Sequence, residues 1–297
     1  MSKKLLYAAQ MTAFDKDGNI NLDGIRALVR YNIDVNKVDV NKFDGLYVCG
    51  RTGEAFMLNT DEKKQVMKTV YDEANGAIDL VAQVGSLNLK EAKELAKFAT
   101  DLGYPKLSAV TPFYYNFTFE QIKDYYNEIL KDVDNKLLIY SIPALTGVAL
   151  TTDQFAELFE NPKIIGIKYT NADFYLLERV RNAFPDQLIL SGFDEMLLPA
   201  LALNVDGCIG STYNLNAPRV REEMDAFDAG DIDKARQLQN ISNDMITDLI
   251  ANDIYPTLKL VMKHMGVDAG YVKKPMSHPT PEMEAGAKAI YEKYFKN

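Results

Sequence analysis

The chain of 297 residues has little histidine or cysteine and no long apolar run. Two histidines, His264 and His278, are too few for a histidine-rich metal site and give poor support to a Ser-His-Asp triad. The two cysteines, Cys49 and Cys208, form neither a disulfide framework nor a cysteine-rich zinc site, so we expect buried free thiols and a cytoplasmic protein. No apolar stretch approaches about 18 residues, so we expect neither a signal peptide nor a membrane span.

Positive charge is also in deficit. Lysine and arginine number 33 against 42 aspartates and glutamates, which gives a formal net charge of −9. This excess of negative charge repels phosphate backbones and anionic headgroups, so it argues against nucleic acid and membrane surfaces as partners. Hydrophobic residues make up 47% of the chain and charged residues 25%, a composition typical of a globular protein with a large core.

Eight short apolar segments recur along the chain, and helical patterns fill the intervals between them. We predict strands at residues 6–11, 45–49, 79–84, 107–110, 137–142, 164–169, 188–191 and 207–209. Most are nearly continuous apolar runs, which is typical of parallel strands covered on both faces. No Gly-x-Gly-x-x-Gly follows the first strand, which disfavours a doubly wound sheet. Eight such units in about 230 residues predict a (β/α)8 barrel.

Helix signals support this alternation. Residues 89–102 carry an apolar stripe with helical spacing, and Gly103 suits the C-cap. Capping boxes at Thr118 with Gln121 and at Thr151 with Gln154 predict the start of two further helices.

The last part of the chain is predicted to be helical. Helices are expected at residues 232–249, 256–265 and 281–295, and no flexible linker separates them from the barrel. We therefore expect a catalytic barrel of residues 1–230 and a C-terminal helical extension of residues 231–297 that packs on it.

Lys168 is the most informative residue, because it ends the apolar run within the strand expected at 164–169. Catalytic residues of such barrels come from the C-terminal ends of the strands. Burial disfavours the ammonium, lowers the pKa of the lysine and yields the free amine that attacks a carbonyl. A Schiff-base nucleophile is one interpretation, and a lysine that extends into solvent is the other.

Other strand ends carry polar or aromatic residues. Gly50–Glu54 offers backbone N–H groups to a carboxylate or forms an ordinary turn. Thr111–Phe117 is dense in aromatics, which indicates a subunit contact, an active-site loop, or both. Tyr140 is either a mouth residue or a core tyrosine. Residues 191–195 and 210–214 offer carboxylates and hydroxyls to a polyhydroxyl substrate, or cap their helices.

The order of these segments resembles the pyruvate-dependent class I aldolases of the N-acetylneuraminate lyase and dihydrodipicolinate synthase superfamily. The resemblance spans essentially the whole chain and is strongest to the sialic acid branch. The most specific segments are Asp44–Val48, Ser108–Tyr115, Gly166–Thr170, Ser191–Glu195 and Ile209–Asn214. The resemblance implies reversible cleavage of N-acetylneuraminate to N-acetylmannosamine and pyruvate, with no metal or organic cofactor, in a homotetramer.

The resemblance also implies roles for single residues. Lys168 would form the imine, Tyr140 would act as acid and base, and Tyr114, with Tyr115 as second choice, would reach a neighbouring subunit's site. Substrate-binding roles fall on Arg51, Thr52, Thr170, Gly192, Asp194, Glu195, Gly210 and Ser211.

Arg51 departs from the pattern of the family, which usually has serine or threonine at this position. Arginine has no acceptor atom and cannot relay a proton as a hydroxyl does, but it can hold a carboxylate in a bidentate fork. We expect an activity that persists in changed form. A smaller departure is Ser141, where many relatives carry asparagine.

Alternatives remain open within and outside this class of enzyme. The dihydrodipicolinate synthase branch typically carries an arginine shortly after the tyrosine of the fifth strand, and Pro143–Gly147 has none. Another sugar-acid aldolase is a further alternative. A non-catalytic paralogue that binds sialic acid or pyruvate is the alternative from another class, and Arg51 is its only support.

Overall fold

The computed structural model describes residues 3–34 and 43–296. Its described strands form a closed barrel in which each strand is parallel to the next in chain order, and the last pairs with the first. The strands are β1 Leu5–Ala9, β2 Gly45–Val48, β3 Asp79–Gln83, β4 Lys106–Val110, β5 Leu137–Ser141, β6 Ile164–Tyr169, β7 Leu188–Ser191 and β8 Gly207–Gly210. The predicted (β/α)8 barrel is therefore confirmed, with β6 and β7 at the predicted residues.

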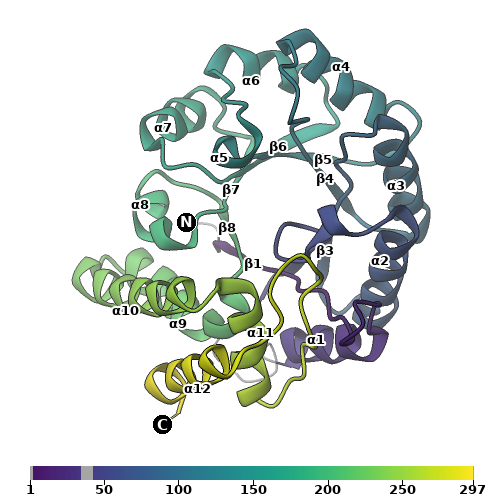
Figure 1. The fold of residues 1–297 in the computed structure, drawn as a ribbon. Coiled ribbons are helices and arrows are strands. Elements are labelled where there is room, and N and C mark those ends of the chain that lie inside the picture. Colours follow the sequence, from purple (N-terminus) through teal and green to yellow (C-terminus); the bar gives the residue numbers. More distant parts are fainter. Residues whose placement is uncertain (1–2, 35–42, 297) are drawn as a thin grey trace.

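Helices surround this barrel (Figure 1). They are α1 Leu22–Asp34, α2 Thr60–Ala74, α3 Leu89–Leu102, α4 Phe119–Leu130, α5 Pro143–Thr146, α6 Thr152–Phe159, α7 Phe174–Ala183, α8 Leu197–Ala202 and α9 Tyr213–Asp228, with short 3-10 turns η1 Ala55–Met57 and η2 Asp194–Met196. Both predicted capping boxes form, at Thr118 and Thr151, and Gly103 is the C-cap of α3.

Strand ends differ from the prediction by one or two residues. The largest difference is in β1, which ends at Ala9 rather than at Met11. Ala9 is the last residue in register with β2, opposite Tyr47. Just after it the Gln10 amide donates to the Tyr47 carbonyl at 2.9 Å, and the Gln10 side chain accepts a hydrogen bond from Asn32 Nδ2 of α1 at 3.0 Å.

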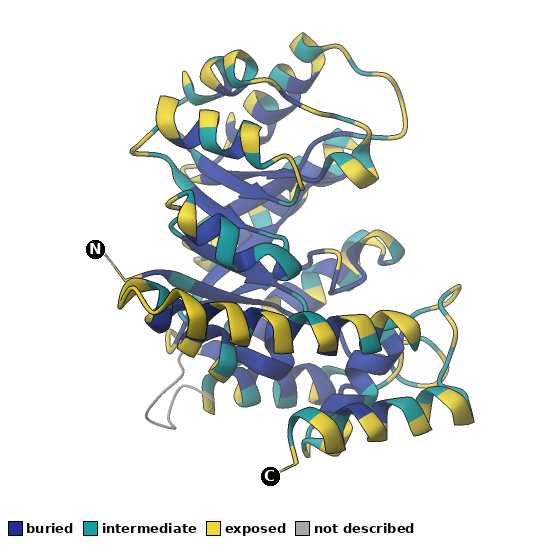
Figure 2. Ribbon diagram, turned by 90° about the vertical axis from the view of Figure 1, so that its left-hand side faces the viewer, coloured by how far each residue is buried: buried dark blue, intermediate teal, exposed yellow. Residues whose placement is uncertain are grey.

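The core has two layers. One lies between the barrel and the surrounding helices, and the other fills the barrel interior. The strand β5 shows the alternation between them, because Leu138 and Tyr140 pack inside while Leu137 and Ile139 pack against the helices. Figure 2 shows the strands almost entirely buried and the outward faces of the helices exposed. Since every position of β5 is buried, its sequence reads as a continuous apolar run.

Three further helices follow α9 and lie together beside β8 and β1 (Figure 1). They are α10 Ile232–Ala251, α11 Ile254–His264 and α12 Pro281–Tyr294. The side chain of Gln239, on α10, binds the barrel at the Leu198 amide (2.9 Å) and the Asp194 carbonyl (3.2 Å). The division of the chain at residue 230 stays a prediction.

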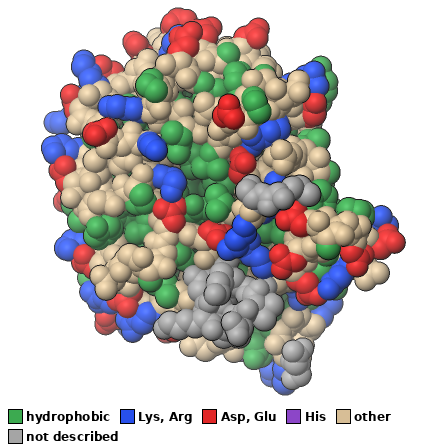
Figure 3. Space-filling view, turned by 180° about the vertical axis from the view of Figure 1, so that it is seen from behind, with side chains coloured by type: hydrophobic (Ala, Val, Ile, Leu, Met, Phe, Trp, Pro, Cys, Tyr) green, Lys and Arg blue, Asp and Glu red, His purple; other side chains and the backbone are tan. Residues whose placement is uncertain are grey.

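Charges of both signs are interspersed on the surface that Figure 3 shows, viewed from behind Figure 1. Ion pairs join neighbouring helices on the outside of the barrel, such as Lys93 of α3 with Glu128 of α4 at 2.7 Å. Pairs of this kind contribute about 0 to 1 kcal/mol each, so the buried layers carry most of the stability. None of the helices in the described ranges has the length and hydropathy needed to cross a membrane.

Candidate active site

Lys168 lies near the C-terminal end of β6 with its side chain buried in the barrel. It is in register with Tyr140 of β5 and Leu190 of β7. Residues in register on parallel strands point to the same face of the sheet, and both partners belong to the interior layer. The end of β6 thus directs the lysine amine inward at the mouth of the barrel.

Two tyrosine rings flank the amine. The Nζ atom of Lys168 lies 4.0 Å from the ring centroid of Tyr47 and 4.2 Å from that of Tyr140. The two rings pack edge to face with centroids 5.9 Å apart. The Tyr47 hydroxyl donates to Ser108 Oγ at 2.9 Å, which fixes this ring in place. Sequence reasoning missed Tyr47, because a tyrosine inside an apolar strand has the same pattern as a core residue.

The environment of Lys168 lowers its pKa to about 7, chiefly because burial disfavours the ammonium. The carboxylate of Asp194 opposes this shift, and the guanidinium of Arg51 adds to it. At neutral pH a large fraction of the lysine is therefore the free amine, the form that attacks a carbonyl carbon.

This pKa predicts the pH dependence of imine formation. Above pH about 7 the amine is neutral and the rate is independent of pH, whereas below it the rate falls by about tenfold per pH unit. Trapping of a pyruvate imine with cyanoborohydride between about pH 5 and about pH 9 measures this profile. Asp194, whose pKa burial raises to about 7, titrates in the same range and broadens the transition. A profile that is flat down to about pH 5 would contradict the assignment.

The hydroxyl of Tyr140 is a second titratable group whose ring lies beside the amine. Burial raises the pKa of Tyr140, so the phenol is protonated before substrate binds. Positive charge from Arg51 and the neighbouring Thr170 hydroxyl oppose this shift and favour the phenolate. A new positive charge at Lys168, 4.2 Å from the ring centroid, would favour the phenolate further.

Hydroxyl groups from two loops meet at the same end of the barrel. The Thr52 and Ser211 hydroxyls, which follow β2 and β8, are 2.6 Å apart. The side-chain amide of Asn214 donates to the Ser211 carbonyl at 2.8 Å and the Ala9 carbonyl at 2.9 Å, which ties this loop to β1. The structure thus brings together two residues that the sequence predicted to bind substrate.

Asp194 follows β7 and is buried. Its carboxylate accepts hydrogen bonds from the Thr212 amide at 2.9 Å and the Thr212 hydroxyl at 2.7 Å. Burial and the adjacent carboxylate of Glu195 raise the pKa of Asp194. A side chain at Gly210 would come within 2.4 Å of Asp194 Oδ1, so glycine makes room for the carboxylate. Glu195 itself is partly exposed, and its carbonyl accepts from Asn243 Nδ2 at 3.1 Å.

Gly192 lies against Lys168. A Cβ atom at this position would be 2.0 Å from Thr170 Oγ1 and 3.1 Å from Lys168 Cε. We expect Gly192→Ala to displace both side chains, at a cost of about 1–3 kcal/mol, and to lower kcat/KM by about tenfold or more. Steady-state kinetics and a thermal melt measure the two effects. Unchanged kcat/KM in a folded variant would show that the site tolerates this displacement.

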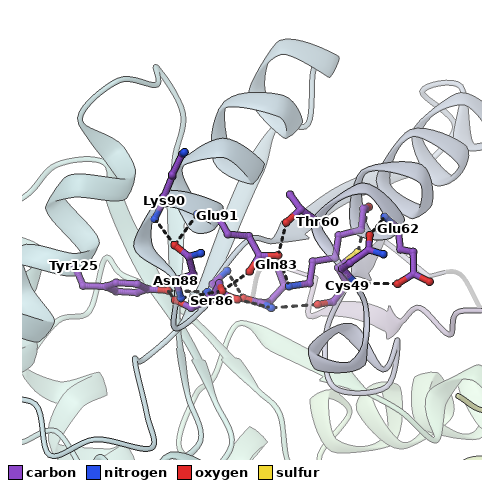
Figure 4. A network of polar contacts seen from close by, with 12 residues as sticks. Cys49, Thr60, Glu62, Gln83, Ser86, Asn88, Lys90, Glu91 and Tyr125 are labelled. Atoms are coloured by element: carbon purple, nitrogen blue, oxygen red, sulfur yellow. Dashed lines mark hydrogen bonds and ion pairs between the residues drawn. The ribbon is translucent and has the colours of Figure 1, made fainter. Parts of the chain in front are cut away.

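A buried polar network supports the loop that carries Arg51 and Thr52 (Figure 4). Gln83, at the end of β3, donates to the Cys49 carbonyl at 3.2 Å and accepts from the Gly85 amide at 2.5 Å. Glu91 of α3 accepts from Thr60, Lys63 and Ser86 at 2.5–3.0 Å. These contacts join the chain after β2 and β3 to α2 and α3. They fix the residues from which the loop with Arg51 and Thr52 begins.

Arg51 extends from this loop to the rim of a pocket of about 180 Å³. The lining residues are Arg51, Phe56, Val110, Phe113, Tyr140, Ile142, Leu145 and Thr146. Tyr114 is not part of this lining. It lies on the loop after β4 with 83% of its surface exposed and φ +76°, so its side chain stays outside the site of its own chain.

An interior lysine at the end of the sixth strand of a (β/α)8 barrel, with a tyrosine in register beside it, defines a site suited to carbonyl chemistry. The chain belongs to the dihydrodipicolinate synthetase family, whose pattern matches residues 2–293. An N-acetylneuraminate lyase of Lactiplantibacillus plantarum is 97% identical over 297 residues, all of both chains.

Other relatives agree. An N-acetylneuraminate lyase of Clostridium perfringens is 59% identical over 292 residues, 98% of this chain and 100% of that one. The crystal structure of CdNal from Clostridium difficile in complex with mannosamine superposes with a TM-score of 0.95. It is 57% identical and covers 99% of this chain and 100% of its own.

Proposed function

We propose that this protein is a class I aldolase that cleaves N-acetylneuraminate reversibly to N-acetylmannosamine and pyruvate. The observation that carries the proposal is the buried Lys168 amine, with a pKa of about 7, in register with Tyr140 at the mouth of the barrel. The relatives named as N-acetylneuraminate lyases support this choice of substrate.

The first step forms the imine. The neutral amine of Lys168 adds to the C2 carbonyl of the open-chain substrate, and the carbonyl oxygen leaves as water. The resulting protonated imine withdraws electrons from C3. Thr52, together with backbone N–H groups of the Arg51 loop, holds the substrate carboxylate so that C2 faces the amine.

The second step breaks the carbon–carbon bond. The positive charge of the imine favours loss of the Tyr140 proton to solvent. The Tyr140 phenolate then removes the proton from the C4 hydroxyl, the C3–C4 bond breaks, and its electron pair moves toward the iminium nitrogen. This yields the aldehyde sugar and an enamine on Lys168. Protonation of the enamine at C3 and hydrolysis of the imine release pyruvate and restore the free amine. The hydroxyl groups of the sugar are bound by Thr170, Gly192, Asp194, Glu195 and Ser211.

Pyruvate release from N-acetylneuraminate, coupled to lactate dehydrogenase, tests the proposal. We expect steady release that depends on enzyme concentration. No release from the folded protein would exclude this substrate, and a screen of other sugar acids would then follow.

Arg51 is the residue that sets this chain apart from the usual pattern of the family. We expect Arg51→Ser to raise kcat, because serine supplies a hydroxyl that can relay protons. The expected increase is about threefold or more, which corresponds to the free energy of about one net hydrogen bond. The same change removes a cation that can grip the substrate carboxylate, so KM rises. The coupled assay measures both constants. Unaltered kinetics would contradict this role of Arg51.

We also propose a homotetramer in which Tyr114 completes a neighbour's site. Exposed aromatic and aliphatic side chains at this edge support it, since Tyr114, Tyr115 and Leu145 line one hollow of about 510 Å³. A cytoplasmic location is proposed on the two buried free thiols, Cys49 and Cys208.

A further inference from the structure

A tyrosine of the C-terminal helices lies at the mouth of the barrel. The Cζ atom of Arg51 is 5.7 Å from the ring centroid of Tyr255, on α11. Tyr255 also lies close enough to Tyr140 to raise the pKa of that phenol, which Arg51 lowers. Three side chains from β5, the loop after β2 and α11 therefore share the space in which the proposed chemistry occurs.

A buried ion pair holds α11 against the Arg51 loop. Lys259 Nζ lies 2.6 Å from Glu54 Oε1, and both side chains are almost completely buried. The same amine donates to the Thr12 carbonyl at 2.7 Å, and the other oxygen of Glu54 accepts from the Lys273 amide at 2.6 Å. Tyr255 and Lys259 are four residues apart and so share one face of α11. The contact that anchors the helix thus also directs Tyr255 toward Arg51.

We propose that Tyr255 is a positioning residue that holds the Arg51 guanidinium over the mouth of the barrel, ready to receive the substrate carboxylate. Arginine loses about 2 kcal/mol of side-chain conformational freedom when it is fixed, and a cation–π contact with a ring places part of this cost in the free enzyme. A planar guanidinium that is held by the ring keeps its N–H groups free to bind a carboxylate in a bidentate fork. The inference rests on the proposed function, because it assumes a carboxylate substrate bound beside Lys168.

Reductive trapping with pyruvate measures this role without any aldehyde substrate. The pyruvate concentration that gives half-maximal trapping is expected to rise about fivefold in Tyr255→Leu, the effect of one cation–π contact between a guanidinium and an aromatic ring. Tyr255→Phe keeps the ring and is expected to restore a value close to that of the parent chain. Tyr271→Leu removes another partly exposed aromatic and serves as the matched control.

A double-mutant cycle separates positioning of Arg51 from a general effect on structure. In the Arg51→Ser background, Tyr255→Leu is expected to change half-maximal trapping by less than about twofold, since the ring then has no guanidinium to hold. Tyr255→Met is made in parallel, so that a folded variant is at hand if leucine lowers the melting temperature. The saturating trapping rate is expected to stay within about twofold, because Lys168 itself is untouched.

The possible failures differ. No trapping in the parent chain would overturn the proposed function and this inference with it. Trapping in the parent chain with an unchanged half-maximal concentration in Tyr255→Leu would overturn the inference alone. An equal effect of Tyr255→Leu with and without Arg51 would show that the ring acts independently of the guanidinium, which also overturns it.

Discussion

Replacement of Lys168 by methionine is expected to lower pyruvate release by at least about 10,000-fold, because no imine can form and the electron sink for bond cleavage is lost. Methionine has a similar length and no charge, so the buried site between Tyr47 and Tyr140 stays filled. The thermal melt is expected to hold or improve, since an amine that burial makes unfavourable has been removed. The coupled assay and differential scanning calorimetry measure the two quantities.

Lys136→Met is the matched control for this variant. Lys136 is exposed and precedes β5, at the opposite end of the barrel from the lysine amine. We expect it to keep the activity of the parent chain. If Lys168→Met kept a kcat/KM above about a tenth of the parent value, catalysis would not proceed through this amine.

Replacement of Tyr140 by phenylalanine is expected to separate the two chemical steps. The ring that flanks Lys168 remains, so pyruvate should still form a reducible imine. The proton acceptor for the C4 hydroxyl is lost, so kcat for cleavage should fall by about 100- to 10,000-fold. The assay for pyruvate release and the trapping assay report on these steps separately.

Tyr126→Phe controls for loss of a buried hydroxyl. Tyr126 is also fully buried and donates to the Ala109 carbonyl at 3.3 Å, but it belongs to the outer layer of the core. This variant is expected to retain full kcat with a modest loss of stability of about 1 kcal/mol. A Tyr140→Phe enzyme with unreduced kcat would remove this residue from the mechanism, and one that fails to trap pyruvate would place its role in imine formation.

The barrel could be predicted because its signals are local. Each strand is a short apolar run, and capping residues such as Thr118 and Thr151 mark where helices begin. Strand ends depend on contacts that are not local. Just after β1 the side chain of Gln10 accepts a hydrogen bond from Asn32 of α1, and no local pattern at residues 9–11 indicates that contact.

Parts of the site could also be predicted, because their signals lie within one strand or between paired strands. Lys168 is conspicuous because a lysine interrupts an apolar strand, and its register with Tyr140 follows from strand pairing. Tyr47 was not visible, since every residue of β2 is buried and no alternation separates inward from outward side chains. Tyr255 was missed because a tyrosine in an amphipathic helix reads as packing, and only the Glu54–Lys259 pair brings that helix to the mouth.

The residue to which pyruvate becomes attached tests the proposed mechanism most directly. The protein is incubated with pyruvate and borohydride, digested, and mapped by mass spectrometry, with Lys259 as the internal comparison because it is equally buried but paired with Glu54. We expect one adduct at near-unit stoichiometry on Lys168 and none on Lys259. An unmodified Lys168 in folded protein, or an adduct carried by another lysine, would contradict it.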